Sequence, residues 1–174
     1  MLQATTTIPA NPPGYFAETH VVENQPPPLR DYNLYQQDVA LCEAVTREGA
    51  AWAEPGLQAF GALTGSRDVI ELGFQANENK PVLYTHDNYG HRIDEVRFHP
   101  AYHRLMQIST EHGLHATHWR KPQSGAHVAR AAMSYLMGQV DAAHGCPITM
   151  TSAVVPALQQ QPDLAAQWLP KITA

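Results

Sequence analysis

The chain has 174 residues, of which 44% are hydrophobic, and its formal net charge is −5 at pH 7. This length allows one domain with a full hydrophobic core. The acidic balance, without any block of lysines or arginines, excludes the electrostatic footprint of a nucleic-acid-binding protein. Cys42 and Cys146 have no paired spacing and no secretory signal begins at Met1, so we expect a reduced, cytoplasmic protein. No apolar run reaches the length of a membrane span.

Residues 1–30 differ from the rest of the chain because they are rich in Thr, Pro and Asn. Three consecutive prolines, Pro26–Pro28, fix φ and hold this stretch extended. We therefore predict a proline-rich arm over residues 1–30 and a helical domain over residues 31–174. Tyr15 and Phe16 favour an arm that is anchored across a partner subunit, whereas the polar composition favours a solvated tail. Both interpretations stay open.

Helical periodicity and capping residues predict three helices in the first half of the domain. Asn33 begins a capping-box-like pattern, and the apolar stripe that follows predicts a long helix over Leu34–Ala53. A proline at the start and a glycine at the end predict a short second helix over Pro55–Gly65. A serine N-cap and a closing proline turn predict the third helix over Ser66–Pro81.

The next segment changes from helical to strand periodicity. Val82–Thr85 and Arg92–Phe98 flank Asp87–Gly90, whose Asn and Gly favour the positive φ values of a tight reversal. We therefore predict a β-hairpin. Pro100 then begins a fourth helix, which is predicted to end at Gly113 as its C′ residue.

The longest helical pattern begins at Ser124, the predicted N-cap, and is the stretch around which we expect the domain to be organised. Its small and apolar residues recur at three- and four-residue spacing: Val128, Ala131, Ala132, Tyr135, Leu136, Gln139, Val140 and Ala143. Ala129 and Met133 extend this surface around the helix, which predicts burial on more than one side. Gly145 is the predicted C′ residue, and Pro147 prevents the helix from continuing.

Histidines invite a metal-site interpretation, because His115 and His118 are three residues apart like ligands on a helical turn. No cysteine or paired carboxylate joins them at a recognised spacing, so we favour solvated or core histidines. Neither a base for a Cys146 nucleophile nor a glycine-rich phosphate loop can be identified. The residues alone therefore predict no catalytic, cofactor-binding or metal-binding side chain.

Four segments are specific enough for comparison with known families: Tyr32–Ala50, Asp94–His103, Cys146–Thr151 and Gln161–Ile172. The first three resemble the N-terminal domain of acyl-CoA dehydrogenase-like flavoproteins of the bacterial alkylation-response (AidB-type) branch. The fourth resembles the general acyl-CoA dehydrogenase pattern in which a helix ends in an aromatic-Leu-Pro before the middle β-domain. The resemblance covers nearly everything after Val22. It implies a mainly α fold, the multi-helix N-terminal domain of that family, with one β-hairpin.

The resemblance also implies what the full-length parent contains. In the family, a middle β-barrel-like domain and a C-terminal four-helix domain, both absent from this chain, enclose FAD together with a neighbouring subunit of a tetramer. The flavin-contacting Met-Thr-Glu segment, the catalytic carboxylate and the region credited with DNA binding would lie beyond Ala174. The expected partners are therefore the missing domains, the other subunits and, in the parent, an acyl-CoA-like substrate, while this chain alone is expected to be inactive and without flavin.

One set of positions here comes closest to a chemical site. In the family, the C-terminal half of the helix before the proline turn lines the acyl-chain channel, and matching at Cys146–Pro147 transfers those positions to Tyr135, Gln139 and Ala143. Their spacing of four places them on one side of a helix. The other interpretation is ordinary interhelical packing. Tyr135 and Gln139 are bulky and polar-tipped, so the parent is expected to prefer short or branched acyl groups or to have a partly blocked channel.

Two functional hypotheses therefore remain. In the first, the chain is the N-terminal part of an FAD-dependent acyl-CoA dehydrogenase-like oxidoreductase, where it shapes the acyl side and the oligomer. In the second, it acts alone as a helical protein-interaction module without enzymatic activity.

Overall fold

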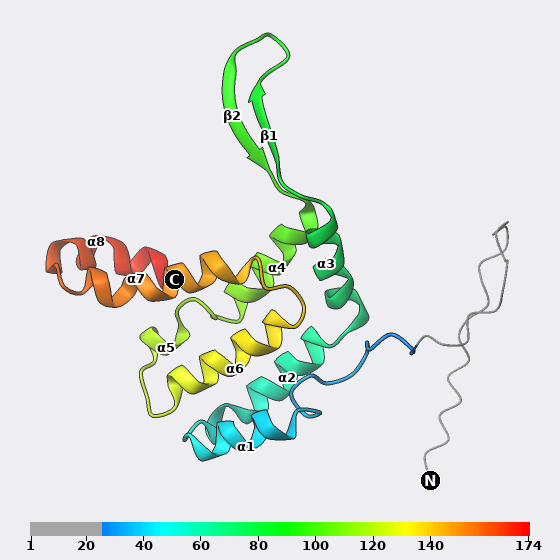
Figure 1. Cartoon of the computed structure of the whole chain (residues 1–174). Coiled ribbons are helices and arrows are strands. Elements are labelled where there is room, and N and C mark those ends of the chain that lie inside the picture. Colours follow the sequence, from blue (N-terminus) through cyan, green and yellow to red (C-terminus); the bar gives the residue numbers. More distant parts are fainter. Residues whose placement is uncertain (1–25) are drawn as a thin grey trace, which may run out of the picture.

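The computed structural model describes residues 26–174, so Tyr15, Phe16 and most of the predicted arm lie outside the described residues. Within that range the elements are, in chain order, α1 (Val39–Arg47), the 3-10 helix η1 (Ala51–Ala53), α2 (Glu54–Thr64), α3 (Arg67–Glu78), β1 (Val82–His86), β2 (Arg92–Arg97), α4 (Pro100–Glu111), α5 (Thr117–Arg120), α6 (Ala126–Gly138), α7 (Gly145–Leu158) and α8 (Pro162–Ile172). The mainly α fold with one hairpin is confirmed (Figure 1). No helix between residues 26 and 174 combines the length and the apolar character that a membrane crossing requires.

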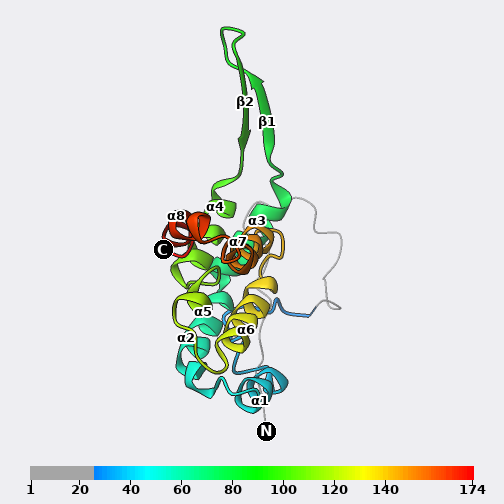
Figure 2. The same ribbon diagram turned by 90° about the vertical axis from the view of Figure 1, so that its left-hand side faces the viewer.

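The hydrophobic core lies where α6 packs against α1, α2, α5 and α7. Its largest fully buried apolar side chains come from α1, α2, α4, α6 and the turn before α1: Tyr35, Val45, Leu57, Phe60, Leu105, Ile108 and Leu136. Burying one side chain of this size contributes about 1.5–3 kcal/mol. Helices distant in sequence are therefore held together mainly by this cluster, and Figure 2 shows α2 and α6 side by side along the body.

The predicted starts of three helices and the predicted end of one of them are confirmed. Pro55 lies in the first turn of α2, where its missing N–H costs no hydrogen bond. Ser66 is the N-cap of α3, and its hydroxyl accepts a hydrogen bond from the N–H of Val69 at 3.4 Å. Pro100 begins α4, and Gly113 follows its C-cap with φ +69°.

The predicted hairpin is also confirmed. β1 and β2 pair antiparallel, with Leu83 opposite Val96. Gly90 has φ +86°, and the carboxylate of Asp87 accepts a hydrogen bond from the N–H of His91 at 2.9 Å, which closes the turn. Every residue of both strands is exposed, and Figures 1 and 2 show the hairpin projecting away from the helices.

The prediction of one long helix over Leu34–Ala53 is wrong. The side chain of Asn33 accepts a hydrogen bond from the N–H of Gln36 at 3.1 Å, as its capping pattern suggests, but it closes only a turn. Asp38 is the N-cap of α1, and Gly49, with φ +80°, ends the helical segment before η1. Short polar side chains that bond to nearby backbone compete with a continuous helix, and here they divide it.

The start and the buried face of the central helix also differ from the prediction. Ser124 is not its N-cap, because α6 follows Gly125 in the left-handed region, at φ +76°. Ala132 is buried as predicted, but Ala131 and Tyr135 are exposed. The helix is therefore covered on one broad face rather than all around.

The end of the central helix lies earlier than predicted. α6 stops at Gly138, and Gly145, the predicted C′ residue, is instead the first residue of α7. Pro147 is the third residue of α7 and lies in its first turn, where a missing N–H costs no intrahelical hydrogen bond. The turn between the helices is closed by Asp141, whose carboxylate accepts a hydrogen bond from the N–H of His144 at 3.0 Å.

Candidate functional site

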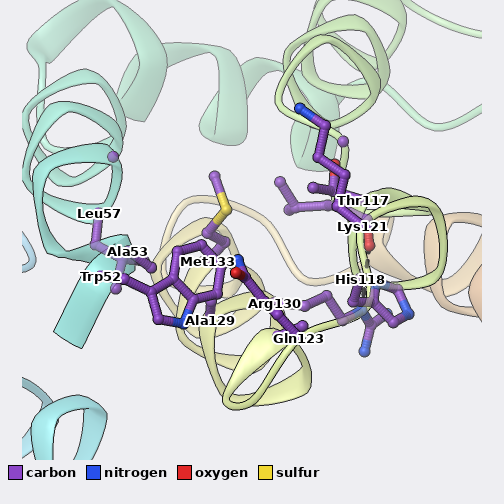
Figure 3. A pocket seen from close by; sticks show the side chains of 14 residues that line it. Trp52, Ala53, Leu57, Thr117, His118, Lys121, Gln123, Ala129, Arg130 and Met133 are labelled. Carbon is purple, nitrogen blue, oxygen red and sulfur yellow. Dashed lines mark hydrogen bonds between the residues drawn. The ribbon is translucent and has the colours of Figure 1, made fainter. Parts of the chain in front are cut away.

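A largely apolar pocket of about 310 Å³ lies between η1, α2, α5 and α6, and we call it the α2–α5–α6 pocket. Its lining residues are Trp52, Ala53, Gly56, Leu57, Gly113, Leu114, Thr117, His118, Lys121, Gln123, Ala126, Ala129, Arg130 and Met133. Figure 3 shows Trp52 and Leu57 on one side, Thr117 and Lys121 on the opposite side, and Arg130 from α6 between them.

The wall formed by η1 is held in place by contacts with the start of α6. The indole Nε1 of Trp52 donates a hydrogen bond to the carbonyl of Ser124 at 2.9 Å. Gly125 packs so closely on the backbone of Gly49 that any Cβ at this position would clash. Because two distant segments meet through backbone atoms, this side of the pocket is built into the fold.

The opposite wall is anchored to α7. His118 Nε2 and the Oγ of Ser152 are 2.9 Å apart, and the indole Nε1 of Trp119 donates to the carbonyl of the same serine at 2.9 Å. Burial, with smaller contributions from nearby His127 and Arg130, lowers the pKa of His118 to about 4. His118 is therefore neutral at pH 7, and its Nδ1 has no hydrogen-bond partner among residues 26–174.

Two cationic side chains border the pocket. Arg130 donates from Nε to the carbonyl of Leu114 at 3.1 Å and from Nη2 to the Oγ1 of Thr149 at 3.2 Å. Burial lowers the pKa of Arg130. Neither Arg130 nor Lys121 forms a salt bridge within the described part of the chain, and no acidic residue lines the pocket. The pocket thus combines an apolar interior with unpaired positive charge.

A second polar cluster joins α4 to the turn before α7. The Nδ1 of His144 and the Oδ2 of Asp141 are 2.8 Å apart, and His144 Nε2 lies 3.0 Å from the Oγ of Ser109. Burial raises the pKa of Asp141, but hydrogen bonds from His144 outweigh it, and the pKa lies below its usual value. We call these three residues the α4–α7 clasp.

The order of groups in the clasp is that of a Ser-His-Asp triad, but its surroundings indicate a structural role. Ser109 and His144 line a cavity of about 240 Å³, but they are only 1% and 0% exposed to solvent. Ser109 also lies inside α4, where no turn presents free N–H groups to stabilise an oxyanion. The Asp-x-x-His spacing in the sequence was the signal that could have revealed this clasp.

The structure does not bring the predicted channel residues together on one helix. Tyr135, 53% exposed, lies on the outer face of α6, and Gln139 is the C-cap of the same helix. Ala143 lies in the turn between α6 and α7, because α6 ends at Gly138. The prediction that all three residues share one helix face is therefore wrong, whereas their role in a channel stays a prediction. As for the histidines, residues 26–174 contain no group of three potential ligands placed to hold a metal ion.

Helices α7 and α8 expose large apolar side chains that the sequence did not single out. Met150 and Val154 are 66% and 37% exposed and lie four residues apart on α7. Leu164 and Trp168 have the same spacing on α8, with 38% and 44% exposed. Helix α8 buries no residue at all within the described chain, although it is amphipathic.

Comparison with known proteins places this fold. The family described as the adaptive response protein AidB N-terminal domain matches residues 24–174. "Putative acyl-CoA dehydrogenase AidB" of Escherichia coli (strain K12) is 51% identical over 144 residues, which are 82% of this chain and 27% of that protein. The chain therefore spans about a quarter of the length of this curated relative.

Two solved structures have a similar fold. One, the apo-form of Bd2924, has a TM-score of 0.75 and 26% identity, covering 83% of this chain and 30% of that chain. The other is ACDH-11 of Caenorhabditis elegans in complex with C11-CoA, with a TM-score of 0.79 and 23% identity, covering 92% of this chain and 28% of that chain. At this identity the second likeness concerns the fold alone.

Proposed function

The chain belongs to the family of adaptive response protein AidB N-terminal domains, and we propose that it is the N-terminal part of an FAD-dependent acyl-CoA dehydrogenase-like oxidoreductase of the DNA alkylation-damage response. In this proposal the parent is a cytoplasmic homotetramer that takes an acyl-CoA-like substrate. The family match, the E. coli relative and the C11-CoA bound by the structural neighbour support it.

The observation that carries the proposal is the uncovered apolar face of α7 and α8. Met150, Val154, Leu164 and Trp168 expose large apolar surfaces on these two packed helices. Large apolar side chains exposed in pairs one helical turn apart are typical of an interaction surface. Since the chain spans about a quarter of its curated relative, we assign this face to the further domains of the parent.

We assign no FAD site to the residues described here. Their strands form only the hairpin of β1 and β2, so no strand leads through a glycine-rich turn into a helix N-terminus, the usual cradle of a dinucleotide pyrophosphate. FAD therefore enters the proposal only for the parent, and no chemical step is assigned to a side chain of this chain.

The chain's part in the proposal is to shape the acyl side and the oligomer. Tyr135 and Gln139 remain candidates for an acyl-channel wall, because both are exposed and lie one helical turn apart. Ala143 is retained as a third candidate on the adjoining turn. For the oligomer, the β1–β2 hairpin adds a second contact surface to the predicted arm, since an isolated two-stranded hairpin is at best marginally stable in water.

The proposal is tested on the full-length parent. Purified parent should carry stoichiometric flavin and reduce it with a series of acyl-CoA thioesters, short or branched chains being preferred. Tyr135→Ala and Gln139→Ala should raise activity toward long chains, whereas Asn77→Ala, on exposed surface of α3, should not. A parent without flavin or without dehydrogenation of any thioester contradicts the proposed function. An unchanged chain-length profile in both variants removes only the channel role.

A stand-alone interaction module is the second candidate, and the projecting hairpin favours it. The reading frame after Ala174 separates the two. A downstream Met-Thr-Glu and glycine-rich segment supports the dehydrogenase-like parent, while an immediate stop codon supports the module.

A further inference from the structure

We propose that the α2–α5–α6 pocket binds a small amphipathic carboxylate, with the apolar chain inside the pocket and the carboxylate at its cationic border, to which Arg130 and Lys121 belong. The proposal rests on the size of the pocket, on its charges and on one unpaired buried nitrogen. It does not depend on the dehydrogenase-like function of the parent.

The size and the lining of the pocket suit a small apolar ligand. A volume of about 310 Å³ lies at the small end of the range of ligand pockets, which is about 300–1,000 Å³. Its interior is lined by aliphatic and methionine side chains that offer no hydrogen bonds: Ala53, Leu57, Leu114, Ala129 and Met133. This lining favours an alkyl or aryl chain over a polar ligand.

The charges at the pocket favour an anion. Arg130 has five N–H donors, and only two of them have partners among residues 26–174. No carboxylate of the described chain pairs with Arg130 or with Lys121, although the protein as a whole is acidic. The two acceptors of Arg130 are neutral, so the desolvation of its partly buried guanidinium is only partly compensated. A ligand carboxylate at this border of the pocket would supply an anionic acceptor.

His118 gives an independent indication of a missing partner. The residue is 3% exposed and lines the pocket, yet its Nδ1 has no partner among residues 26–174. Buried polar groups are nearly always hydrogen-bonded, so an orphan nitrogen calls for an explanation. In the tautomer with the proton on Nδ1, the hydroxyl of Ser152 donates to Nε2, and the Nδ1 proton is left without an acceptor among residues 26–174.

The pocket is distinct from the proposed channel wall. Ala126 and Met133 line the pocket from α6. With about 100° per residue, Tyr135 lies roughly opposite Ala126 around the helix. Ligand binding in the pocket can therefore be separated from any effect at Tyr135.

The test measures octanoate binding to the 174-residue chain by calorimetry, with chemical shifts locating the ligand. Octan-1-ol, with the same chain but no charge, should bind about tenfold more weakly, because it cannot form charge-assisted hydrogen bonds. Lys121→Gln should weaken octanoate binding several-fold without weakening the binding of octanol. Lys80→Gln, which replaces an exposed lysine outside the pocket, should change the binding of neither ligand.

A variant that fills the pocket provides the second arm. Gly56 lies inside α2 and lines the pocket, and a Cβ there meets no atom within 4 Å. Gly56→Leu should therefore fold normally and abolish octanoate binding. Gly138→Leu, which also enters open space but lies outside the pocket, should leave binding unchanged. Absence of octanoate binding at millimolar concentration overturns the proposal. So does octanoate binding that persists in Gly56→Leu, or equal affinity for octanoate and octanol.

Discussion

Helices α6 and α8 are both amphipathic, yet their environments differ completely. α6 buries Ala126, Ala129, Ala132, Leu136 and Met137, whereas α8 buries no residue within the described chain. α6 packs against α1, α2, α5 and α7 with one broad face, while α8 packs on α7. An amphipathic pattern therefore predicts that a helix has a partner, but it does not tell whether the partner belongs to the same chain.

Helix α7 connects these two regions through two buried histidines. His118 links α5 to Ser152 in α7, and the α4–α7 clasp fixes the turn from which α7 starts. These contacts bind α7 to the packed region on its inner side, although Met150 and Val154 remain exposed. The variants below test whether stability is concentrated in α6 and at this seam rather than in α8.

The largest effect is expected in α6. Ala132→Asp places a carboxylate without a partner at a site that is 3% exposed, and it should lower the free energy of unfolding by about 3 kcal/mol or more. Ala131→Asp, one residue away on exposed surface, should cost only about 0.5 kcal/mol. Urea denaturation of both variants measures the difference. Equal midpoints would mean that the buried face of α6 is assigned wrongly.

The second effect concerns His118 and appears as a pH dependence. The pKa of His118 is about 4 in the folded state and near the ordinary 6.5 in the unfolded state. Below pH 6.5 the unfolded chain binds a proton that the folded chain does not, so stability should fall as the pH drops toward 4. The full loss is on the order of 3 kcal/mol, because one pK unit corresponds to about 1.4 kcal/mol.

Denaturation at a series of pH values checks this window. In His118→Gln the free energy of unfolding should change less between pH 6.5 and 4 than in the unsubstituted 174-residue chain, since the titrating ring is gone. His127→Gln, which removes an exposed histidine beside it, should retain most of the slope. Identical slopes in all three proteins would show that His118 does not remain neutral in the folded state.

A smaller effect is expected at the clasp. Asp141→Asn removes the negative charge that accepts hydrogen bonds from His144, and it should cost about 1–2 kcal/mol at pH 7. The pKa of Asp141 is lowered in the folded state, so its contribution is present above the usual pKa and is lost as the pH falls through the folded value. Thermal melting at pH 7 measures the cost of Asp141→Asn, and thermal melting in acid measures how much of that cost disappears. Asp163→Asn, in the exposed first turn of α8, is the control. If Asp163→Asn destabilised the chain as much as Asp141→Asn does, the stabilising role assigned to Asp141 would be contradicted.

Much of the fold could be predicted from local chemistry, because certain residues allow only one interpretation. Gly90 with Asp87 marks the hairpin turn, and proline or serine marks the starts of α2, α3 and α4. The motif at Gly145 is ambiguous by contrast. Glycine followed by proline suits the end of one helix as well as the start of the next, and only the contacts of Asp141 with His144 decide between them.

The pocket could not be predicted, because no local motif encodes it. Its walls meet through contacts such as that of Trp52 with Ser124, 72 residues apart in the chain. The family resemblance correctly indicated the fold, and it also suggested a channel at Tyr135, Gln139 and Ala143, which stays a prediction. Assigning the channel positions to these residues assumed that one helix continues up to the proline turn. Because α6 ends at Gly138, Ala143 does not lie on that helix.

The smallest effect within this chain is expected in α8. Leu164→Gln replaces a side chain that is already 38% exposed, so unfolding of the 174-residue chain should change by about 0.5 kcal/mol or less. If the apolar face of α8 is covered by further domains, the same substitution in the full-length parent buries an amide against apolar surface and should cost about 1–3 kcal/mol. Denaturation of both proteins, with and without the substitution, gives the two values. A small effect in both would mean that α8 is a surface helix in the parent as well, and the contrast between α6 and α8 would then reflect ordinary exposure rather than a missing partner.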